Sequence, residues 1–503
     1  MGKGSKSFIV DIPLKSDSGF EKAIHNALKA KSSLRNWLVN TQRRAAKAAR
    51  ENPELPPILR LPKATKEDKK IRNDALNAFF KKTGFTEGQF QVLAQDKRNA
   101  CWIGHHLMGA DTQKIASDVA KSYVKYILRK GGLPRRKKAR DVNSIEGKDN
   151  KCVFTYRSGT LRWKKHVVPL LLRNTEWEKE ALKNRVKFCR IVRRTIRTHF
   201  HIQLIMEGLP PQKITPGDGA GAIDLGPKNL ALVVADQFAA KSPLIDDRNF
   251  EKNTGLIKAL KRRIDRCRRA GNPTNYRPDG TVKRGKRSWT KSKKELRLET
   301  EAKELSRRIT MRADQLQGTL LNKLLSYAVD WSLENTSQRS WQHHFGKAVG
   351  RYRPGRFIEL LCRKAENAGG KVTKIPLRMR LSQYDHISNN YTKKPLSQRV
   401  HVLPDGTSLD RDLYSAFLAL GFSEELGSID TSRVKALWPG AEPLLRNPVS
   451  TMGLTAQLTR KWSASPTSVP ATAGTIDLVD SKPPALPRSR LCRTHGKDRN
   501  TGS

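Results

Sequence analysis

An α/β protein of several domains is predicted by three features of the sequence. Residues 19–129 place apolar side chains at helical spacing, as in FEKAIHNALKAKSSLRNWLVN. Shorter runs that alternate apolar residues with Arg and Lys lie before and after this region, at 7–14 and 152–208. From residue 218 onwards, strand-like segments that end in acidic residues alternate with helical segments. The 503 residues exceed what a single hydrophobic core usually organises, so several domains are expected.

The charge of the chain predicts a polyanionic partner. Lys and Arg total 98 against 47 Asp and Glu, which gives a formal net charge of +51 at pH 7. Such an excess is hard to sustain in a compact fold unless a polyanion neutralises it, and nucleic acid is the natural candidate. An extended contact with RNA or DNA is therefore expected.

The cysteine pattern and the absence of apolar runs indicate a cytoplasmic protein. Single cysteines stand at positions 101, 152, 189, 267, 362 and 492, with no Cys-x-x-Cys pair. This separation argues against a disulfide framework and a Cys-rich zinc site, and it fits a reducing compartment. The N-terminus has no signal-peptide core, and no later run of about 18 apolar residues occurs, so we expect no membrane partner.

The N-terminal part begins with a strand and continues as helices. Phe8, Val10 and Ile12 share one face of the strand predicted at 7–14. The helices at 19–129 carry Lys and Arg on much of their exposed faces. This favours a helical nucleic-acid-recognition lobe over an ordinary solvated surface.

A basic loop and basic strands follow the helices. Gly131 and Gly132 interrupt the helical pattern ahead of four consecutive basic residues, Arg135, Arg136, Lys137 and Lys138. The runs CVFTYRSGTLRWKKHVVPLLL and RVKFCRIVRRTIRTHFHIQLIMEG then alternate apolar and basic residues, and the second contains Arg193 and Arg194. Strands of this kind bury one face and present a cationic face to phosphate. We expect them to join the N-terminal strand in a small β-barrel.

The segment GAIDLGPKNLALVV is the most informative part of the chain. It predicts a strand that ends at Asp224, a Gly-Pro turn and a second strand returning beside the first. Asp224 would present a free carboxylate at a strand end, and an acidic turn residue is the simpler alternative. The segment resembles the first catalytic motif of RuvC domains, the RNase-H-like nucleases of type V CRISPR effectors and of transposon-encoded TnpB proteins. This resemblance implies that Asp224 is a catalytic metal ligand.

A second acidic residue is implied by the same resemblance, at the end of a strand that follows a long helical insertion. The segment SYAVDWSLEN supplies two candidates, Glu334 and Asp330. Glu334 stands where TnpB-like sequences carry their glutamate, and Asp330 is the alternative. An amphipathic helix around Phe357 and Leu361 and a return strand at 371–375 continue the resemblance.

The third acidic motif is LDRDLYSAFLA at residues 409–419, which is similar to the start of the family's last catalytic helix. The resemblance implies that Asp412 is the third catalytic residue. A carboxylate at a helix N-terminus also lies where the helix dipole and free N–H groups favour anions. Asp410 is interpreted as the N-cap, and Arg411 as a candidate phosphate contact.

The three motifs occur in the family's order between residues 218 and 422. The resemblance implies an RNA-guided DNA endonuclease of CRISPR defence that binds guide RNA and target double-stranded DNA, recognises a short adjacent DNA motif and forms an R-loop. Asp224, Glu334 and Asp412 would bind Mg²⁺ or Mn²⁺, which prefer oxygen ligands, and hydrolyse DNA phosphodiesters in a prokaryotic cytoplasm. The alternatives are a TnpB-type nuclease and a guide-directed DNA-binding silencer with little cleavage.

The fold implied by the resemblance is bilobed, with a split β-barrel wedge, an inserted helical recognition lobe and an RNase-H-like RuvC domain. The implied domains are a wedge strand at 1–18, a helical lobe at 19–145, a wedge barrel at 146–215, RuvC motifs I and II at 216–380 with a helical insertion at 250–327, a target-loading segment at 381–408 and RuvC motif III at 409–438. Frequent Pro, Ser and Thr predict a disordered tail at 439–503.

The chain departs from the family at residues 381–408, where related proteins carry a four-cysteine zinc knuckle. This segment contains no cysteine, and His386, His401 and Asp405 are a poor substitute for thiolates. We therefore predict no zinc here. Elsewhere, the basic turn within the helical insertion offers further candidates for nucleic-acid contacts, Arg284, Arg287 and Trp289, and an exposed basic loop is the alternative.

Overall fold

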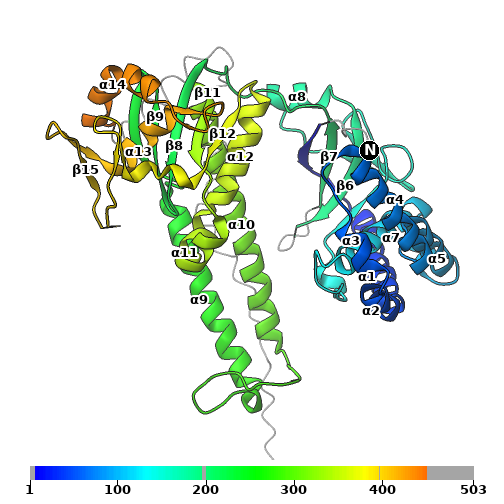
Figure 1. The fold of residues 1–503 in the computed structure, drawn as a ribbon. Coiled ribbons are helices and arrows are strands. Elements are labelled where there is room, and N and C mark those ends of the chain that lie inside the picture. Colours follow the sequence, from blue (N-terminus) through cyan, green and yellow to red (C-terminus); the bar gives the residue numbers. More distant parts are fainter. Residues whose placement is uncertain (1–5, 195–199, 396, 450–503) are drawn as a thin grey trace, which may run out of the picture.

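The computed structural model describes residues 6–194, 200–395 and 397–449, which form a mixed α/β protein with two bodies (Figure 1). The N-terminal body contains helices and two antiparallel sheets, and the C-terminal body is built on a five-stranded sheet. Within these ranges, no helix combines the length and apolar character needed to cross a bilayer.

The first sheet of the N-terminal body joins segments that lie far apart in the chain. Its order is β1 (Ser7–Pro13), β7 (Phe200–Glu207), β6 (Val186–Arg193) and β2 (Ser144–Glu146). Phe8, Val10 and Ile12 alternate along β1 and enter the core of this body. The pairing of β1 with β7 therefore places the intervening helices as an insertion within one sheet.

The inserted helices cover the core face of this sheet. Their bounds are α1 (Ser18–Thr41), α2 (Arg43–Glu51), α3 (Leu55–Arg60), α4 (Lys66–Thr83), α5 (Glu87–Asn99), α6 (Ile103–His106) and α7 (Gly109–Ile127). Side chains cap several of these N-termini, with Asp17 accepting from the Phe20 N–H and Thr65 from the Asp68 N–H. Phe20, Leu34 and Tyr123 are among the buried residues that hold the helices to the sheet.

A second, smaller sheet follows. It contains β3 (Thr155–Arg157), β4 (Thr160–Trp163) and β5 (His166–Pro169), and α8 (Glu176–Leu182) leads from it to β6. An isolated bridge between Leu14 and Leu170 connects it to the end of β1. The described strands thus form two linked sheets, and their closure into one barrel stays a prediction.

The C-terminal body has a five-stranded sheet in the order β10-β9-β8-β11-β12. The strands are β8 (Gly219–Leu225), β9 (Asn229–Val234), β10 (Phe238–Pro243), β11 (Ala328–Glu334) and β12 (Val372–Ile375). β9 is antiparallel to both of its neighbours, whereas β11 is parallel to β8 and to β12. The carboxyl ends of β8 and β11 therefore meet at one edge of the sheet.

Each face of this sheet has its own hydrophobic core. One face packs against α9 (Arg248–Ala270), α10 (Lys293–Leu325) and α12 (Pro354–Asn367), with α11 (Gln338–Tyr352) beside them. The other face packs against α13 (Arg411–Leu420) and α14 (Thr431–Arg446). Figure 1 shows α9 and α10 extending away from the sheet as a helical pair, which has a small core of its own around Leu260 and Leu298.

Short elements connect the larger ones. Single-turn 3₁₀ helices span Ala139–Asp141, Pro273–Asn275, Leu377–Met379 and Leu381–Gln383. Two-stranded ribbons pair β13 (Tyr384–Asp385) with β14 (Asn390–Tyr391), β15 (Val400–Val402) with β16 (Ser408–Asp410), and β17 (Phe422–Ser423) with β18 (Ser428–Ile429).

The start of the predicted disordered tail is corrected by α14. This helix continues to Arg446 and contains Pro439 and Pro443, although proline removes a helical hydrogen bond. Val434, Ala441 and Leu445 on one side of α14 are buried against the sheet, and this packing offsets the loss. The remainder of the tail, from residue 450, lies outside the described residues.

Candidate active site

Asp224 lies near the carboxyl end of the central strand β8, on the face that α13 covers. Ala222, two residues earlier on the same face, belongs to the core beneath α13, whereas Ile223 and Leu225 enter the opposite core. Gly221 fits this strand because a Cβ atom there would lie 2.6 Å from the indole ring of Trp331. The glycine thus leaves room for the indole ring of Trp331 beside the paired strands β8 and β11.

Glu334 ends the neighbouring parallel strand. Leu333 pairs with Ile223, so Glu334 and Asp224 stand one step further along the two strands. Trp331 and Leu333 point into the opposite core, which directs Ser332 and Glu334 to the α13 face by alternation. The two acidic residues are therefore neighbours on one face of the sheet.

Asp412 reaches this face from the second residue of α13. The helix begins after Asp410, whose Oδ1 accepts hydrogen bonds from the Asp412 N–H at 3.0 Å and the Leu413 N–H at 3.1 Å. Beneath the helix, the sheet presents the small residues Ala222 and Ala231, which belong to the same core as α13. Small side chains permit close packing, and the start of α13 lies near the acidic strand ends.

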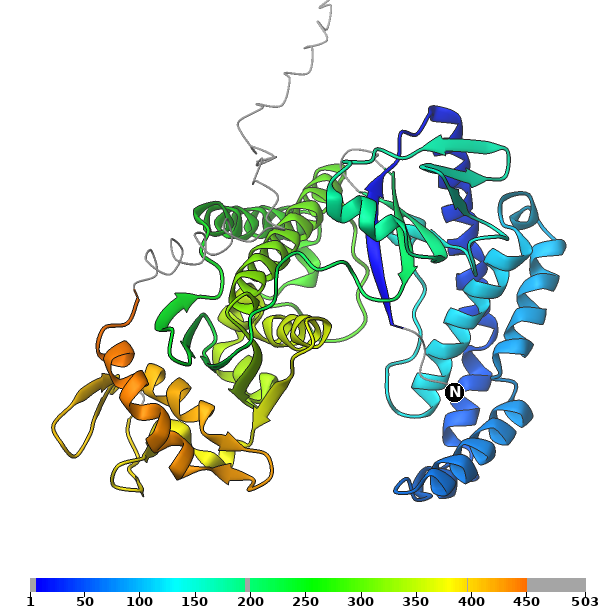
Figure 2. The ribbon, with the colours of Figure 1, turned by 90° about the horizontal axis from the view of Figure 1, so that it is seen from above.

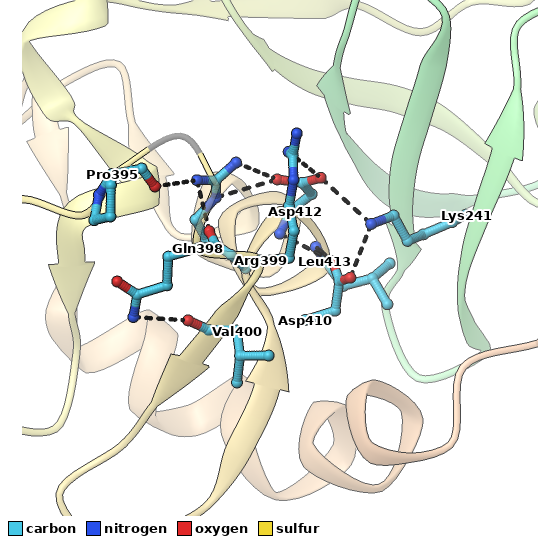
Figure 3. A network of polar contacts seen from close by, with 9 residues as sticks. Lys241, Pro395, Gln398, Arg399, Val400, Asp410, Asp412 and Leu413 are labelled. Atoms are coloured by element: carbon cyan, nitrogen blue, oxygen red, sulfur yellow. Dashed lines mark hydrogen bonds and ion pairs between the residues drawn. The ribbon is translucent and has the colours of Figure 1, made fainter.

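Three cationic side chains contact the Asp412 carboxylate (Figure 3). Lys241 Nζ lies 3.3 Å from Asp412 Oδ2 and 2.8 Å from Asp410 Oδ2. Arg399 Nη1 lies 3.6 Å from Asp412 Oδ2, and Arg411 Nη2 lies 3.1 Å from Asp412 Oδ1. Both oxygens of this carboxylate are thus paired.

Arg411 also fastens the loop before β15. Its side chain donates to the Gln398 carbonyl at 2.9 Å, and its backbone N–H donates to the Arg399 carbonyl at 2.8 Å. The residue is buried, with 8% of its surface exposed. In this conformation its guanidinium is occupied by protein groups, and its predicted contact with phosphate stays a prediction.

Burial and neighbouring charges raise the pKa of Asp224 to about 7. Burial is the largest cause, the carboxylates of Glu334 and Asp412 add to it, and Arg411 and Lys241 oppose it. The mutual influence of the three acidic groups reflects their proximity. No ion pair to Asp224 or Glu334 is found among the described residues.

The other two acidic residues respond in opposite directions. Burial raises the pKa of Glu334, and a hydrogen bond from the Leu381 backbone N–H opposes this rise. Burial would also raise the pKa of Asp412, but Lys241 and Arg411 outweigh it and the pKa is lowered. Among the described residues, the site therefore contains one carboxylate in ion pairs, Asp412, and two for which no ion pair is found.

The chemistry of these residues fits a divalent cation. Carboxylate oxygens are the ligands that Mg²⁺ prefers, and a cation would relieve the repulsion that raises the pKa of Asp224. The three carboxylates do not yet converge on one metal position. Among the described residues, no three His, Cys, Asp or Glu side chains are arranged to hold a metal. Asp412 would have to exchange a cationic partner for the metal.

The alternative candidates lie elsewhere or have other contacts. Asp330 is exposed near the start of β11, at the opposite end from Glu334, and its Oδ1 accepts from the Lys371 N–H at 2.8 Å. Asp410 serves as the N-cap of α13. Lys228 is exposed in the turn after β8.

The cysteine-free segment contains a buried polar network. His401 Nε2 lies 3.3 Å from Asp385 Oδ2, and His386 Nδ1 lies 2.6 Å from the Tyr414 hydroxyl. Tyr414 belongs to α13, so the network connects the β13–β14 and β15–β16 ribbons to the helix that carries Asp412. Asp405 lies apart in a turn, where its Oδ1 accepts from the Thr407 N–H at 2.9 Å.

The predicted basic contacts are dispersed over the molecule. Arg135, Arg136, Lys137 and Lys138 are exposed. The Lys137 backbone is fastened to α1, with its carbonyl accepting from Asn36 Nδ2 at 2.8 Å. Arg194 is paired with Asp11 at 2.5 Å, and Arg193 donates to the Arg140 carbonyl at 3.2 Å.

The remaining predicted contacts lie in the turn between α9 and α10. Arg284 and Trp289 are exposed there, with Trp289 41% exposed and its ring against Tyr276. Arg287 Nε donates to the Gly285 carbonyl at 3.3 Å. These residues are remote from the acidic strand ends, at the far end of the helical pair (Figures 1 and 2).

Lys241 and Arg399 are site residues that motif reading missed, and only Lys241 has a signal in the sequence. The signal in the sequence is a lysine within FAAKSP, where Phe238 and Ala240 enter one core and Ala239 the other. A lysine on a strand face otherwise made of alanine indicates an anionic partner nearby. Recognising it requires knowledge of which strand lies beside which.

Comparison with known proteins finds similarity only among solved structures. No protein-family model and no curated protein matches the sequence. A cryo-EM structure of a Cas12f1–sgRNA–target DNA complex is similar with a TM-score of 0.42 and 13% identity, over 82% of this chain and 98% of that chain. The mini-RNA-guided endonuclease CRISPR-Cas phi3 is similar with a TM-score of 0.28 and 10% identity, over 64% of this chain and 59% of that chain.

Proposed function

We propose that this protein is an RNA-guided endodeoxyribonuclease that hydrolyses DNA phosphodiesters at a single metal-dependent RuvC site. The observation that carries the proposal is the meeting of Asp224 and Glu334 at adjacent strand ends beneath the start of α13, where Asp412 lies. The strand directions also suit an RNase-H-like core. In this sheet β9 is antiparallel to β8, whereas β11 and β12 run parallel to β8.

The three acidic residues have distinct proposed roles. Asp224 and Asp412 are the principal ligands of Mg²⁺ or Mn²⁺, and Glu334 completes the site and orients the attacking water. A divalent cation supplies charge stabilisation for the phosphate when it is bound. Partial burial of Asp224 and Glu334 would strengthen their interactions with a cation.

The guide is proposed from the motif resemblance together with the charge. A net charge of +51 suits a long nucleic-acid path, and base pairing then selects the sequence while the protein contacts the backbone. Guide RNA and target double-stranded DNA are the proposed partners. The N-terminal helices and basic strands would hold the RNA–DNA duplex, and the displaced strand would enter the RuvC site.

A cleavage assay tests this function. Full-length protein purified with its associated RNA should cut matched DNA in Mg²⁺ and not in EDTA. Asp224→Asn should lower the cleavage rate by at least about 100-fold and leave DNA binding intact, because even outer-shell partners of a metal account for about 10–100-fold. Asp74→Asn, an exposed change on α4, serves as the control. Cleavage that persists in Asp224→Asn would contradict the assignment.

Guide-directed binding without efficient cleavage is the second candidate. It is favoured by the pairing of Asp412 with Lys241, Arg399 and Arg411, which occupies both carboxylate oxygens. Tight binding of matched DNA with no product from the unchanged protein would select this candidate. A repeat-spacer array or transposon ends beside the gene would distinguish a CRISPR effector from a TnpB-type nuclease.

A further inference from the structure

Lys241 occupies the same cross-strand row as the acidic strand ends. It pairs with Ala231 on β9, and Ala231 pairs with Asp224 on β8. Glu334 on β11 pairs with Ile375 on β12 in the continuation of this row. The methyl group of Ala231 is the only side chain between Lys241 and Asp224 in the row, which leaves the lysine room to extend beneath the start of α13.

The ammonium group of Lys241 connects two aspartates with different tasks. Asp410 uses Oδ1 to cap α13 and Oδ2 to accept from Lys241 at 2.8 Å. Asp412 accepts from the same ammonium at 3.3 Å. Lys241 thereby joins the cap of the helix to the carboxylate that the helix presents (Figure 3).

The other two cations around Asp412 are less able to fix its position. One lies in an exposed loop, and the other is adjacent to Asp412 in sequence. Arg399 lies in the loop before β15, and its side chain is 64% exposed. Arg411 is the neighbour of Asp412 in sequence and moves with it. Lys241 stands on a paired strand of the sheet that also carries Asp224. Of the three cations, it is therefore the one that fixes the position of the Asp412 carboxylate relative to the sheet that carries Asp224 and Glu334.

We propose that Lys241 is a positioning residue of the candidate active site, which holds the Asp412 carboxylate in the direction required for metal binding with Asp224 and Glu334. This inference rests on the proposed metal-dependent function. A compact ammonium suits this role because it can contact two carboxylates at once and shift when one of them gains another cation. A lysine that served only as a surface ion pair would have little effect on metal affinity.

Manganese binding in the absence of nucleic acid tests the proposal without cleavage. Full-length protein is titrated with Mn²⁺ and followed by electron paramagnetic resonance, for the unchanged protein, Lys241→Met and Lys241→Arg. We expect Lys241→Met to weaken Mn²⁺ binding by about 10–100-fold, as for other outer-shell partners, and Lys241→Arg to retain most of the affinity. Lys261→Met, at an exposed position on α9, is the matched control.

The outcomes separate this inference from the function on which it rests. Unchanged or tighter Mn²⁺ binding in Lys241→Met would overturn the positioning role and show that the lysine only competes with the metal. Failure of the unchanged protein to bind Mn²⁺ would overturn the proposed metal site itself, and the inference with it. Lys241→Gln, which keeps a hydrogen-bond donor, replaces Lys241→Met if thermal unfolding shows that the methionine variant is not folded.

Cleavage provides a second readout that a purely structural role would not give. In Lys241→Met bound to its guide, the lost rate should return as the Mn²⁺ concentration is raised, because the defect lies in metal affinity. A rate that stays low at every Mn²⁺ concentration would contradict positioning through the metal ligand.

Discussion

At the residue scale, the pKa of the Asp224 carboxyl group responds to four charged neighbours. Glu334 and Asp412 raise its pKa, whereas Arg411 and Lys241 lower it, and burial exceeds all of these effects. The protonation state of Asp224 therefore depends on how much positive charge lies near the ends of β8 and β11. A bound cation is expected to keep Asp224 ionised over a wider pH range.

The raised pKa makes the stability of the metal-free protein depend on pH. The pKa of Asp224 is about 7 in the folded protein against an ordinary value of 3.8. Between these values the folded state keeps the proton and the unfolded state has lost it, so stability falls as the pH rises from about 4 to about 7.

Asp224→Asn should remove this dependence. The advantage of the variant in unfolding free energy over the unchanged protein should grow between pH 5 and pH 8, by on the order of 1 kcal/mol or more. Differential scanning calorimetry in EDTA measures this, with Asp74→Asn as the control. An equal difference at both pH values would show that ionisation of Asp224 is not its cause.

The residue scale also shows what local sequence can indicate. The motifs around Asp224, Glu334 and Asp412 contain their own strand, turn and cap signals, so their places at strand ends and at a helix start could be predicted locally, whereas their candidate roles came from the resemblance. Lys241 and Arg399 could not, because their significance depends on β10 lying two strands from β8 and on a loop folding back over α13. Their contacts arise from pairing between distant segments, which no local pattern contains.

At the element scale, α13 is held by a buried polar network from the cysteine-free segment at 381–408. His386, His401 and Asp385 are buried, and the Tyr414 hydroxyl accepts from the His386 backbone N–H at 3.1 Å. Trp438 of α14 packs on the His386 ring with centroids 4.6 Å apart. Hydrogen bonds and aromatic contacts here join two ribbons and two helices.

This network leads us to expect stability that is independent of zinc. A strong zinc chelator such as 1,10-phenanthroline should leave the thermal unfolding temperature unchanged.

Tyr414→Phe should destabilise the protein by about 1–3 kcal/mol, because the buried His386 N–H loses its acceptor. Phe417→Leu changes packing on the same helix without removing a hydrogen bond. Its thermal unfolding temperature should be the same at all chelator concentrations. Unfolding at lower temperature in the chelator would contradict this view.

The length of α14 illustrates a limit of propensity at this scale. Pro439 and Pro443 indicate an irregular segment when they are read alone. The burial of Val434, Ala441 and Leu445 against the sheet favours the helix in spite of them. Tertiary packing therefore stabilises a helix in a region where the composition predicts a disordered tail.

At the scale of the whole molecule, two bodies have separate hydrophobic cores. The core of the N-terminal body includes no residue of the cores on either face of the five-stranded sheet. Polar contacts cross between the bodies, such as Lys303 Nζ to Asp141 Oδ1 at 3.0 Å and Lys6 Nζ to Glu366 Oε2 at 3.9 Å. Because the buried cores are separate, relative motion of the bodies is the expected behaviour.

The overall charge leads us to expect strongly salt-dependent binding of nucleic acid. A plot of log affinity against log salt should be linear, with a slope of about −0.9 for each phosphate neutralised on duplex DNA. Changing Arg135 and Arg136 together to Gln should reduce the magnitude of the slope by up to about 2 if both contact phosphate. Fluorescence anisotropy over a salt series measures this.

Two lysines that already have acidic partners provide the control for this experiment. Lys179 on α8 pairs with Glu176 at 2.8 Å, and Lys183, which caps the end of α8, pairs with Glu180 at 2.5 Å. Changing both to Gln should alter the slope less than the arginine pair does. An equal effect of the two double variants would indicate diffuse charge rather than contacts by the basic loop.

The pairing of β1 with β7 has a consequence for synthesis on the ribosome. Among the strands of that sheet, residues 7–13 are made first and their partner at 200–207 is made last. At about 5–20 residues per second, the first strand waits on the order of 10–40 s for its neighbour. During this interval the apolar face of β1 and the basic helices that follow it are present in the nascent chain without a completed sheet. The time at which this body can fold is thus set by its last strand.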